Sequence, residues 1–408
     1  MEQHLLPVWG DSRFFPAARE YGLPPGKWWD ESALGYAHAL ISYIHWKRPF
    51  KFPDHAIIFG DSGGFTLRFA GKPPKGGVDP IKVLEWQEAT CTIGCALDIP
   101  PGVGTTITIG KNAHKFTYPR RWAPALVKTV QHVERALPVY RQMRERGTKF
   151  RWYGVLHGNN EAEVRAYHDA IAKVYPFAEE GEGWAIRPEP QVDVFATSRS
   201  LRILPQLGIT RAHFLAATSQ KVISVLLALG PVAGMKFITY DSAYAIKSGF
   251  NRHVFIPTED GLNFTISTEM GLERHGRDWL FTQCKCPVCA HLRVRETELS
   301  TKRREETHRP EFGGLWSLWF QMHNMYVQQS IVEAQAVEAA KHPEEFLRLA
   351  LSDDDEVPEH GTFHQHTKLS ARGGSLYSKV MRVFEEDGHE RGAIVPTGTS
   401  RSLLDFIE

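Results

Sequence analysis

The chain has no long hydrophobic run, almost no net charge and no leader-like start, and each of these shortages bears on the class of protein to expect. No stretch reaches the roughly 20 consecutive apolar residues that a membrane-spanning helix needs, so we expect no membrane partner. The first residues, "MEQHLLPVWGDSR", lack the basic flank and apolar core of a signal peptide, which favours a cytoplasmic location. The formal net charge is +1, so no global positive field indicates nucleic acid, although a local basic groove is compatible with a neutral protein.

Cysteine is also scarce, and its distribution says more than its number. The 408 residues include 5 cysteines, an odd count that does not suit a disulfide framework. Cys91 and Cys95 are interpreted as packing residues, whereas Cys284, Cys286 and Cys289 cluster in "CKCPVC". Three thiolates at C-x-C-x-x-C spacing are typical of a tetrahedral zinc site, which needs a fourth ligand.

The candidates for that fourth ligand are histidines downstream of the cluster. We favour His323, in "FQMHNMYV", because this segment has the pattern of a helix whose apolar face can pack against the rest of the protein. His291 follows Cys289 too closely to complete a tetrahedron, and His308 lies in a charged stretch interpreted as a loop. Four protein ligands leave no open coordination position, so the sequence predicts a structural zinc ion rather than a catalytic one.

The chain otherwise shows an alternation of two patterns. Short apolar runs occur at residues 56–59, 93–97, 151–156, 183–186, 212–217 and 235–240, with a further candidate at 262–266. Segments of helical periodicity lie between them, at 123–147, 161–175 and 219–230. This order predicts a parallel sheet covered by helices. About seven such units approach the eight of a (β/α)8 barrel, so we expect an α/β fold of that type.

We expect additions on both sides of this barrel. Residues 1–55 are rich in Trp, Pro and Tyr, which favours an irregular N-terminal cap. The barrel is expected over 56–340, with the zinc subdomain inserted at about 268–330. Residues 341–408 are expected to form a C-terminal extension that includes a solvated acidic run, "SDDDE".

Acidic residues follow three of the predicted strands. Asp61 ends the first run in "FGDSGGF", Asp98 ends the second, and Asp241 ends the run at 235–240. His157 ends the run at 151–156. A single aspartate at such a position usually caps a helix or a turn. Because the carboxyl ends of parallel strands meet at one face, three of them predict a shared pocket.

A pocket with three carboxylates suits chemistry at a glycosidic bond. One carboxylate can act as a nucleophile, a second as a general acid/base, and a third can accept hydrogen bonds from N1–H and the exocyclic amine of a guanine-like base. Paired carboxylates also serve glycosidases built on barrels. A hydrolase of glycosides or nucleosides that uses Asp61 and Asp241 on water is therefore an alternative.

Three features together resemble the tRNA-guanine transglycosylases, zinc-bearing (β/α) barrels that exchange guanine for a 7-deazaguanine base. They are "DSGGF", the segment "YDSAYAIKSGFNR", and C-x-C-x-x-C followed by a distant histidine in an "HN" context. The resemblance covers about residues 56–335. It implies that Asp241 is the nucleophile that attacks C1′ and forms a covalent glycosyl-enzyme, and that Asp61 is the general acid/base.

The resemblance also implies a set of base-binding residues, namely Ser62, Asp98, His157, Gly158 and Ala217. In this set Asp98 pairs with the guanine edge. "GVLHGNN" resembles the G-x-x-Q-G-G stretch of the family, which places His157 where a base-contacting Gln is usual. "FLAATS" resembles the glycine-rich strand end whose backbone contacts the base, with Ala216 and Ala217 at those positions.

Departures from the tRNA enzymes indicate which nucleic acid is modified. Thr66 follows "DSGGF" where the tRNA enzymes usually show Gln, and the P-T-R tract that follows the nucleophile in the bacterial enzymes is missing after Asp241. No C-terminal RNA-binding domain of archaeal type is recognisable. The pattern is similar to the DNA-guanine transglycosylases, which insert 7-cyano-7-deazaguanine into bacterial or phage DNA. It implies DNA and a 7-deazaguanine base as partners, with other DNA-modification proteins, in a bacterium or a phage-infected host.

The alternatives on the same resemblance are a tRNA enzyme of the queuosine or archaeosine type and a non-catalytic paralogue. Asp241 argues against the latter, and a homodimer like those of the tRNA enzymes is compatible with either nucleic acid.

An enzyme that acts on DNA must also unstack its target base, at a cost of a few kcal/mol. Basic residues near the strand ends are candidates to fill the space that the unstacked base leaves in the duplex: Arg120, Arg121, Lys247 and Arg252. The charged segment "RVRETELSTKRREETHRP" is either a phosphate-binding insertion or a solvated helix.

Overall fold

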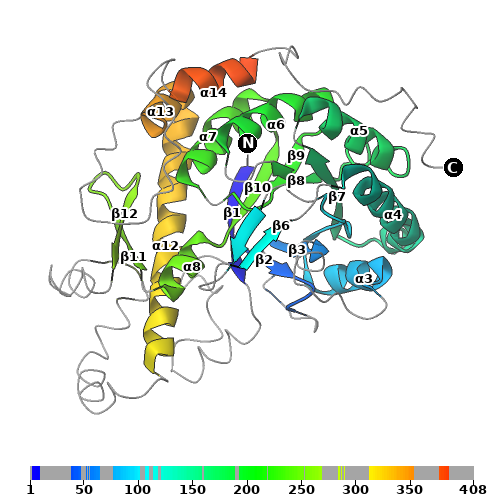
Figure 1. Ribbon diagram of the computed structural model, residues 1–408, viewed down its shortest axis with the longest axis horizontal. Helices are drawn as coiled ribbons and strands as arrows, with labels where there is room; N and C mark the ends of the chain where they lie inside the picture. The colour runs from blue at the N-terminus through cyan, green and yellow to red at the C-terminus, as the bar shows by residue number, and fades with distance from the viewer. Residues whose placement is uncertain are drawn as a thin grey trace.

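A computed structural model of the protein contains one closed barrel of parallel strands (Figure 1). The structure describes residues 2–9, 38–46, 52, 54, 56–64, 77–101, 106–109, 114–117, 121–158, 160–188, 193–217, 219–251, 253–268, 284, 286, 289, 312–352 and 376–385. In spatial order the strands are β1 (Glu2–Trp9), β10 (Phe237–Ser242), β9 (Arg211–Phe214), β8 (Trp184–Pro188), β7 (Arg151–Gly158), β4 (Ile93–Cys95), β3 (Ile58–Asp61) and β2 (Ala39–Ser42). The expected parallel α/β barrel is confirmed.

Two of the barrel strands precede the point at which the barrel was expected to begin. β1 pairs with β10 on one side and with β2 on the other, so it closes the barrel. The prediction of an irregular cap over residues 1–55 is therefore wrong for these two strands. The apolar stretches of these strands, "LLPVW" in β1 and "ALI" in β2, lie in a segment rich in Trp, Pro and Tyr, so the sequence pattern did not distinguish them from irregular structure. The candidate run at 262–266 lies outside the barrel, in β12 (Phe264–Thr268).

Helices cover the outside of the barrel. They are α3 (Pro80–Thr90), α4 (Trp122–Glu145), α5 (Glu161–Ala172), α6 (Val194–Gln206) and α7 (Gln220–Val232). α4, α5 and α7 confirm the helical periodicity at 123–147, 161–175 and 219–230. Asp79, Asn160 and Asp193 each cap a helix by accepting a hydrogen bond from a backbone N–H of its first turn. These caps fix where each helix begins after its loop.

Aromatic rings fill the interior of the barrel. Phe59 on β3 and His213 on β9 come from opposite strands and stack with their ring centroids 3.7 Å apart. Tyr153 on β7 meets Phe59 edge to face at 6.1 Å. The interior is thus a packed core rather than a channel, and polar chemistry is left to the carboxyl ends of the strands.

A second layer lies beside the barrel after β10 (Figure 1). It consists of α8 (Tyr244–Phe250), an antiparallel hairpin of β11 (His253–Pro257) and β12, and the long helix α12 (Phe312–Lys341). α12 packs against α8, β11 and α7. A separate hairpin of β5 (Thr106–Ile109) and β6 (His114–Thr117) lies in the chain between β4 and α4.

The described parts of residues 341–408 pack on the outer helices. α13 (Pro343–Ala350) contacts α7, and α14 (Leu376–Glu385) contacts α6. The Ser198 hydroxyl donates to the carbonyl of Val380 at 3.2 Å, and Arg202 donates to the carbonyl of Val383 at 3.1 Å. Among the helices that the structure describes, none combines the length and apolar character needed to cross a membrane.

Candidate active site and metal centre

The three aspartates predicted to share a pocket come together at the carboxyl end of the barrel. Asp61 is the last residue of β3, Asp98 lies three positions beyond the end of β4, and Asp241 is the penultimate residue of β10. Asp98 and Asp241 are 7% and 6% exposed, and the charges of both act on Asp61. Three strand ends thus bring carboxylates close enough for the charges of two of them to act on the third, Asp61, which is half-buried.

The Asp61 carboxyl titrates close to neutral pH. Burial is the largest cause, and together with the charges of Asp98 and Asp241 it raises the pKa of Asp61 to about 6. The neighbouring Ser42 side chain and the Gly63 backbone oppose this shift. A carboxyl with a pKa near the working pH can both give and take a proton, which is what a general acid/base requires.

Asp98 is held in the ionised state by its neighbours. Burial acts to raise its pKa, but a hydrogen bond from His157, the charge of that ring and a hydrogen bond from Ser62 lower the pKa of Asp98 on balance. His157 Nε2 lies 2.8 Å from Oδ2, and the Ser62 hydroxyl donates to Oδ1 at 3.0 Å. A Cβ at Gly64 would lie 2.4 Å from the same Oδ1, so the second glycine of "DSGG" permits this close approach. Asp98 is therefore a fixed acceptor.

Asp241 is oriented by two donors that lie on the preceding strand and the turn that follows it. The backbone N–H of Ala216 donates to Asp241 Oδ1 at 2.7 Å, and Nε2 of His213 lies 3.2 Å from the same oxygen. His213 Nδ1 lies 2.8 Å from the Thr239 hydroxyl. His213 and Thr239 were not predicted from the sequence, where their only signal is a polar residue inside an otherwise apolar strand.

The Ala216 turn has an unusual backbone. Its φ of 61° is the only positive value at a non-glycine position in the part of the chain that the structure describes. An alanine pays about 1 kcal/mol or more for this left-handed conformation. The turn directs the N–H of Ala216 at Asp241 and leaves Ala217 buried beside it. Strain of this kind is commonly retained where it positions a functional group.

The remaining predicted base-binding residues have contacts within the protein. His157 and Ser62 both form hydrogen bonds with Asp98, so they fix the orientation of its carboxylate. A Cβ at Gly158 would lie 2.7 Å from Val164, so close packing on α5 already explains this glycine. Their contact with a base stays a prediction.

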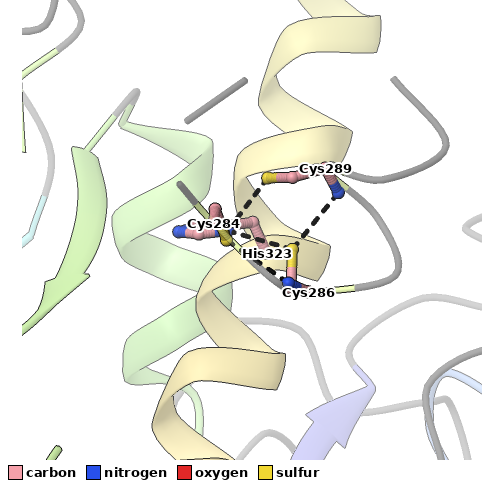
Figure 2. A group of neighbouring side chains, drawn as sticks. All are labelled: Cys284, Cys286, Cys289 and His323. Carbon is pink, nitrogen blue, oxygen red and sulfur yellow. Dashed lines mark hydrogen bonds between the residues drawn. The ribbon is translucent and has the colours of Figure 1, made fainter. Parts of the chain in front are cut away.

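A second cluster lies between α12 and the segment that contains the three clustered cysteines (Figure 2). Cys284, Cys286, Cys289 and His323 are all buried, and their ligand atoms lie within 4.8 Å of one another. His323 Nδ1 is 3.6, 3.3 and 3.4 Å from the Sγ atoms of Cys284, Cys286 and Cys289. A tetrahedron with Zn–S of about 2.3 Å and Zn–N of about 2.0 Å has N···S edges of about 3.5 Å. The four residues predicted as ligands therefore have the spacing to hold a metal ion, consistent with zinc.

The partner of the other ring nitrogen supports this reading of His323. Its Nε2 lies 2.8 Å from the carbonyl oxygen of Phe255, which can only accept, so Nε2 carries the hydrogen and Nδ1 faces the thiols with its lone pair. The next residue, Asn324, accepts from the Phe255 N–H at 2.8 Å and donates to the carbonyls of His253 and Ala245 at 2.9 and 3.3 Å. The "HN" pair thus ties α12 to β11 and α8.

Several other candidates contribute less to these two sites. Arg121 precedes α4 and Lys247 lies on α8, and both are exposed. Other predicted features lie outside the described residues: Thr66, Arg120, Arg252, the alternative ligands His291 and His308, and the charged segment that follows the cysteines. Cys91 and Cys95 are buried free thiols, as expected of packing residues.

Comparison with protein-family models found no matching family, and comparison with curated proteins found no match either.

Proposed function

We propose that the protein is a base-exchange transglycosylase that replaces guanine in DNA by a 7-deazaguanine base, 7-cyano-7-deazaguanine, through a covalent ester on Asp241. The observation that carries the proposal is the convergence of three carboxylates, two of them buried and one half-buried, in three different environments. Asp61 has a pKa of about 6, the pKa of Asp98 is lowered, and Asp241 accepts two hydrogen bonds on one oxygen. Because the three carboxyl groups have different neighbours, each can take a different role in the reaction.

In the proposed first step, an oxygen of Asp241 forms a bond to C1′ while the C1′–N9 bond breaks. The electron pair of that bond goes to the guanine, which takes a proton from Asp61. In the second step, N9 of the incoming base attacks C1′, its N9–H proton goes to Asp61, and the ester bond to Asp241 breaks. One carboxyl group thus serves as acid and then as base, which suits its pKa near neutrality.

Asp98 would provide recognition of the base. Its two oxygens are positioned by His157 and Ser62, and each has a further lone pair that can accept from N1–H or from the exocyclic amine of guanine. The choice of DNA over tRNA follows from the departures at Thr66 and downstream of Asp241.

The metal cluster would have a structural role in this enzyme. Cys284, Cys286, Cys289 and His323 would hold a zinc ion with no open position, so the ion would cross-link its ligands. Its ligand His323 and the neighbouring Asn324 contact β11 and α8, which continue the chain directly after Asp241.

A base-exchange assay tests the proposal. The purified protein would be incubated with radiolabelled guanine and with duplex DNA, single-stranded DNA or bulk tRNA in parallel. We expect label in DNA and not in tRNA. We also expect Asp241→Asn to abolish it, while Asp169→Asn, at an exposed aspartate on α5, leaves it unchanged. Label in tRNA alone would make the protein a tRNA-guanine transglycosylase, and release of guanine without incorporation would make it a hydrolase.

A further inference from the structure

The imidazole ring of His213 lies inside the barrel, and one face of the ring packs against another aromatic ring. Its exposed fraction is 0%, and it stacks on Phe59 with the ring planes only 16° apart. A ring in this position cannot reach a nucleotide at the mouth of the barrel. Any contribution to the chemistry must therefore pass through a group that His213 contacts.

Both ring nitrogens of His213 face residues of the neighbouring strand β10. The register pairs His213 with Thr239, and Asp241 follows two residues later on the same face of the strand. Nδ1 lies 2.8 Å from Thr239 Oγ1, and Nε2 lies 3.2 Å from Asp241 Oδ1. The spacing of two residues along one strand thus places a hydroxyl and a carboxylate on the two sides of one imidazole.

The partners determine where the protons lie. Asp241 Oδ1 already accepts from the Ala216 N–H, and a carboxylate oxygen in this position accepts, so His213 Nε2 carries the hydrogen that faces Asp241. Burial is the main influence on this ring and lowers the pKa of His213, although Asp241 opposes the shift. The ring is then neutral with a single N–H, and Nδ1 accepts from the hydroxyl of Thr239. The Thr239 hydroxyl thus donates a hydrogen bond to His213 Nδ1, and His213 Nε2–H donates one to Asp241.

We propose that His213 is a positioning residue for Asp241, which holds Oδ1 so that Oδ2 is presented to C1′ of the substrate. Ala216 is the second donor to Oδ1, and both described hydrogen bonds of this carboxylate fall on that oxygen. The inference rests on the proposed function for the identity of the substrate. The orientation of the carboxylate does not depend on it.

The first test needs no activity. The protein would be labelled with 15N-histidine, and the ring signals of His213 would be assigned by their loss in His213→Gln. We expect a neutral ring with its hydrogen on Nε2, and a change in both ring signals in Asp241→Asn and in Thr239→Val. A hydrogen on Nδ1, or His213 signals that Asp241→Asn leaves unchanged, would overturn the inference whatever the activity of the protein.

The second test separates positioning from packing. His213→Phe keeps a flat ring to stack on Phe59 but has no donor for Asp241. We expect kcat of base exchange to fall about 100-fold with KM within about threefold, because a misplaced nucleophile slows the chemical step more than it weakens binding. His213→Gln should recover about tenfold of this loss, because its amide can donate to Oδ1.

The matched control is His168→Phe, at a histidine on the outer helix α5, which should keep the wild-type rate. Thermal stability and bound metal are measured for every variant. The inference is overturned if kcat in His213→Phe is unchanged, if only KM rises, or if His213→Gln is as slow as His213→Phe. An inactive wild-type protein whose NMR spectra match the expectation would instead reject the proposed function and keep the positioning of Asp241.

Discussion

At the residue scale, the site gives three identical carboxyl groups three different environments. Burial and two neighbouring charges act on Asp61, hydrogen bonds from His157 and Ser62 dominate at Asp98, and donors from the adjacent strand end hold Asp241. The type of residue is therefore less informative than its neighbours. Each neighbour can be changed by itself, which makes the assignment testable.

The raised pKa of Asp61 has a consequence for stability. Its folded-state pKa of about 6 exceeds the ordinary value of 3.8, so the native protein binds more protons than the unfolded chain between these values. The contribution of Asp61 to stability is therefore most favourable below pH 4 and is lost as the pH rises through 6. Asp61→Asn should be more stable than the wild type at pH 8 by about 1–2 kcal/mol, while exchange activity is lost.

Thermal or urea unfolding between pH 4 and pH 8 measures this difference. The advantage of the Asp61→Asn variant should grow with pH and be small at pH 4. Asp169→Asn, at an exposed site, should show no such trend. A variant that is less stable than the wild type at pH 8 would contradict the assigned pKa.

The left-handed turn at Ala216 gives a second prediction at this scale. With φ at 61°, a glycine fits without strain, whereas a β-branched residue fits poorly. Ala216→Gly should keep its activity and gain up to about 1 kcal/mol in stability. Ala216→Val should lose about 2 kcal/mol and misdirect the N–H that holds Asp241, with a lower kcat. Equal initial rates in the two variants would contradict a role for this turn in orienting the carboxylate.

At the element scale, local patterns predicted six of the eight barrel strands and the helices α4, α5 and α7, but they missed β1, β2, α3 and α6. α4 and α5 were expected from their periodicity, because 12 to 24 residues repeat the pattern several times. β1 and β2 were not expected, because their apolar stretches lie in a segment rich in Trp, Pro and Tyr, and because one partner of β1 lies far along the chain. Glu2 of β1 pairs with Phe237 of β10, and no local pattern reports such a pairing.

The same limit applies to the site. The three aspartates were predictable because each follows an apolar run, and His323 was predictable because three clustered thiols require a fourth ligand. His213 was not predictable, because its role depends on the register between β9 and β10. A histidine inside an apolar segment becomes informative only when its neighbours across the strands are known.

Asn324 on α12 offers a prediction for the contact between elements. It is fully buried and satisfies backbone groups of Phe255, His253 and Ala245. Asn324→Leu leaves these groups unpaired, so we expect a loss of about 2–4 kcal/mol in urea unfolding, with the metal still bound. Glu333→Leu, at an exposed position of the same helix, should change stability by less than about 0.5 kcal/mol. Equal stability of the two variants would show that α12 is not anchored through Asn324.

At the scale of the whole molecule, the metal cluster and the carboxylates are separate sites joined by one layer of structure. The cluster lies on α12 outside the barrel, and α12 packs on α8, which begins three residues after Asp241 (Figure 1). Gln328 of α12 also reaches the hydroxyl of Ser242, the next residue in the chain, at 3.5 Å. Disorder in this layer should therefore change the position of Asp241.

Metal removal tests that connection. The purified protein should contain about one zinc ion per chain, and both a strong chelator and Cys286→Ser should remove it. We expect the midpoint of thermal unfolding to fall by several degrees and amide exchange to accelerate in α8, β11 and α12. The far-UV signal of the barrel should persist, because the stacked core around Phe59 and His213 contains no metal ligand. Base exchange should be lost with the ion and regained when zinc is added back to the wild type.

Cys91→Ala provides the matched control, since this buried thiol lies at the C-terminal end of α3, against β3, and outside the cluster. It should retain zinc and the protection of α12, even if removing a side chain from the core lowers stability. A protein that keeps its exchange rate and its protection pattern without zinc would show that the layer between the two sites does not depend on the ion. The position of Asp241 would then depend on β9 and β10 alone, through His213 and the turn at Ala216.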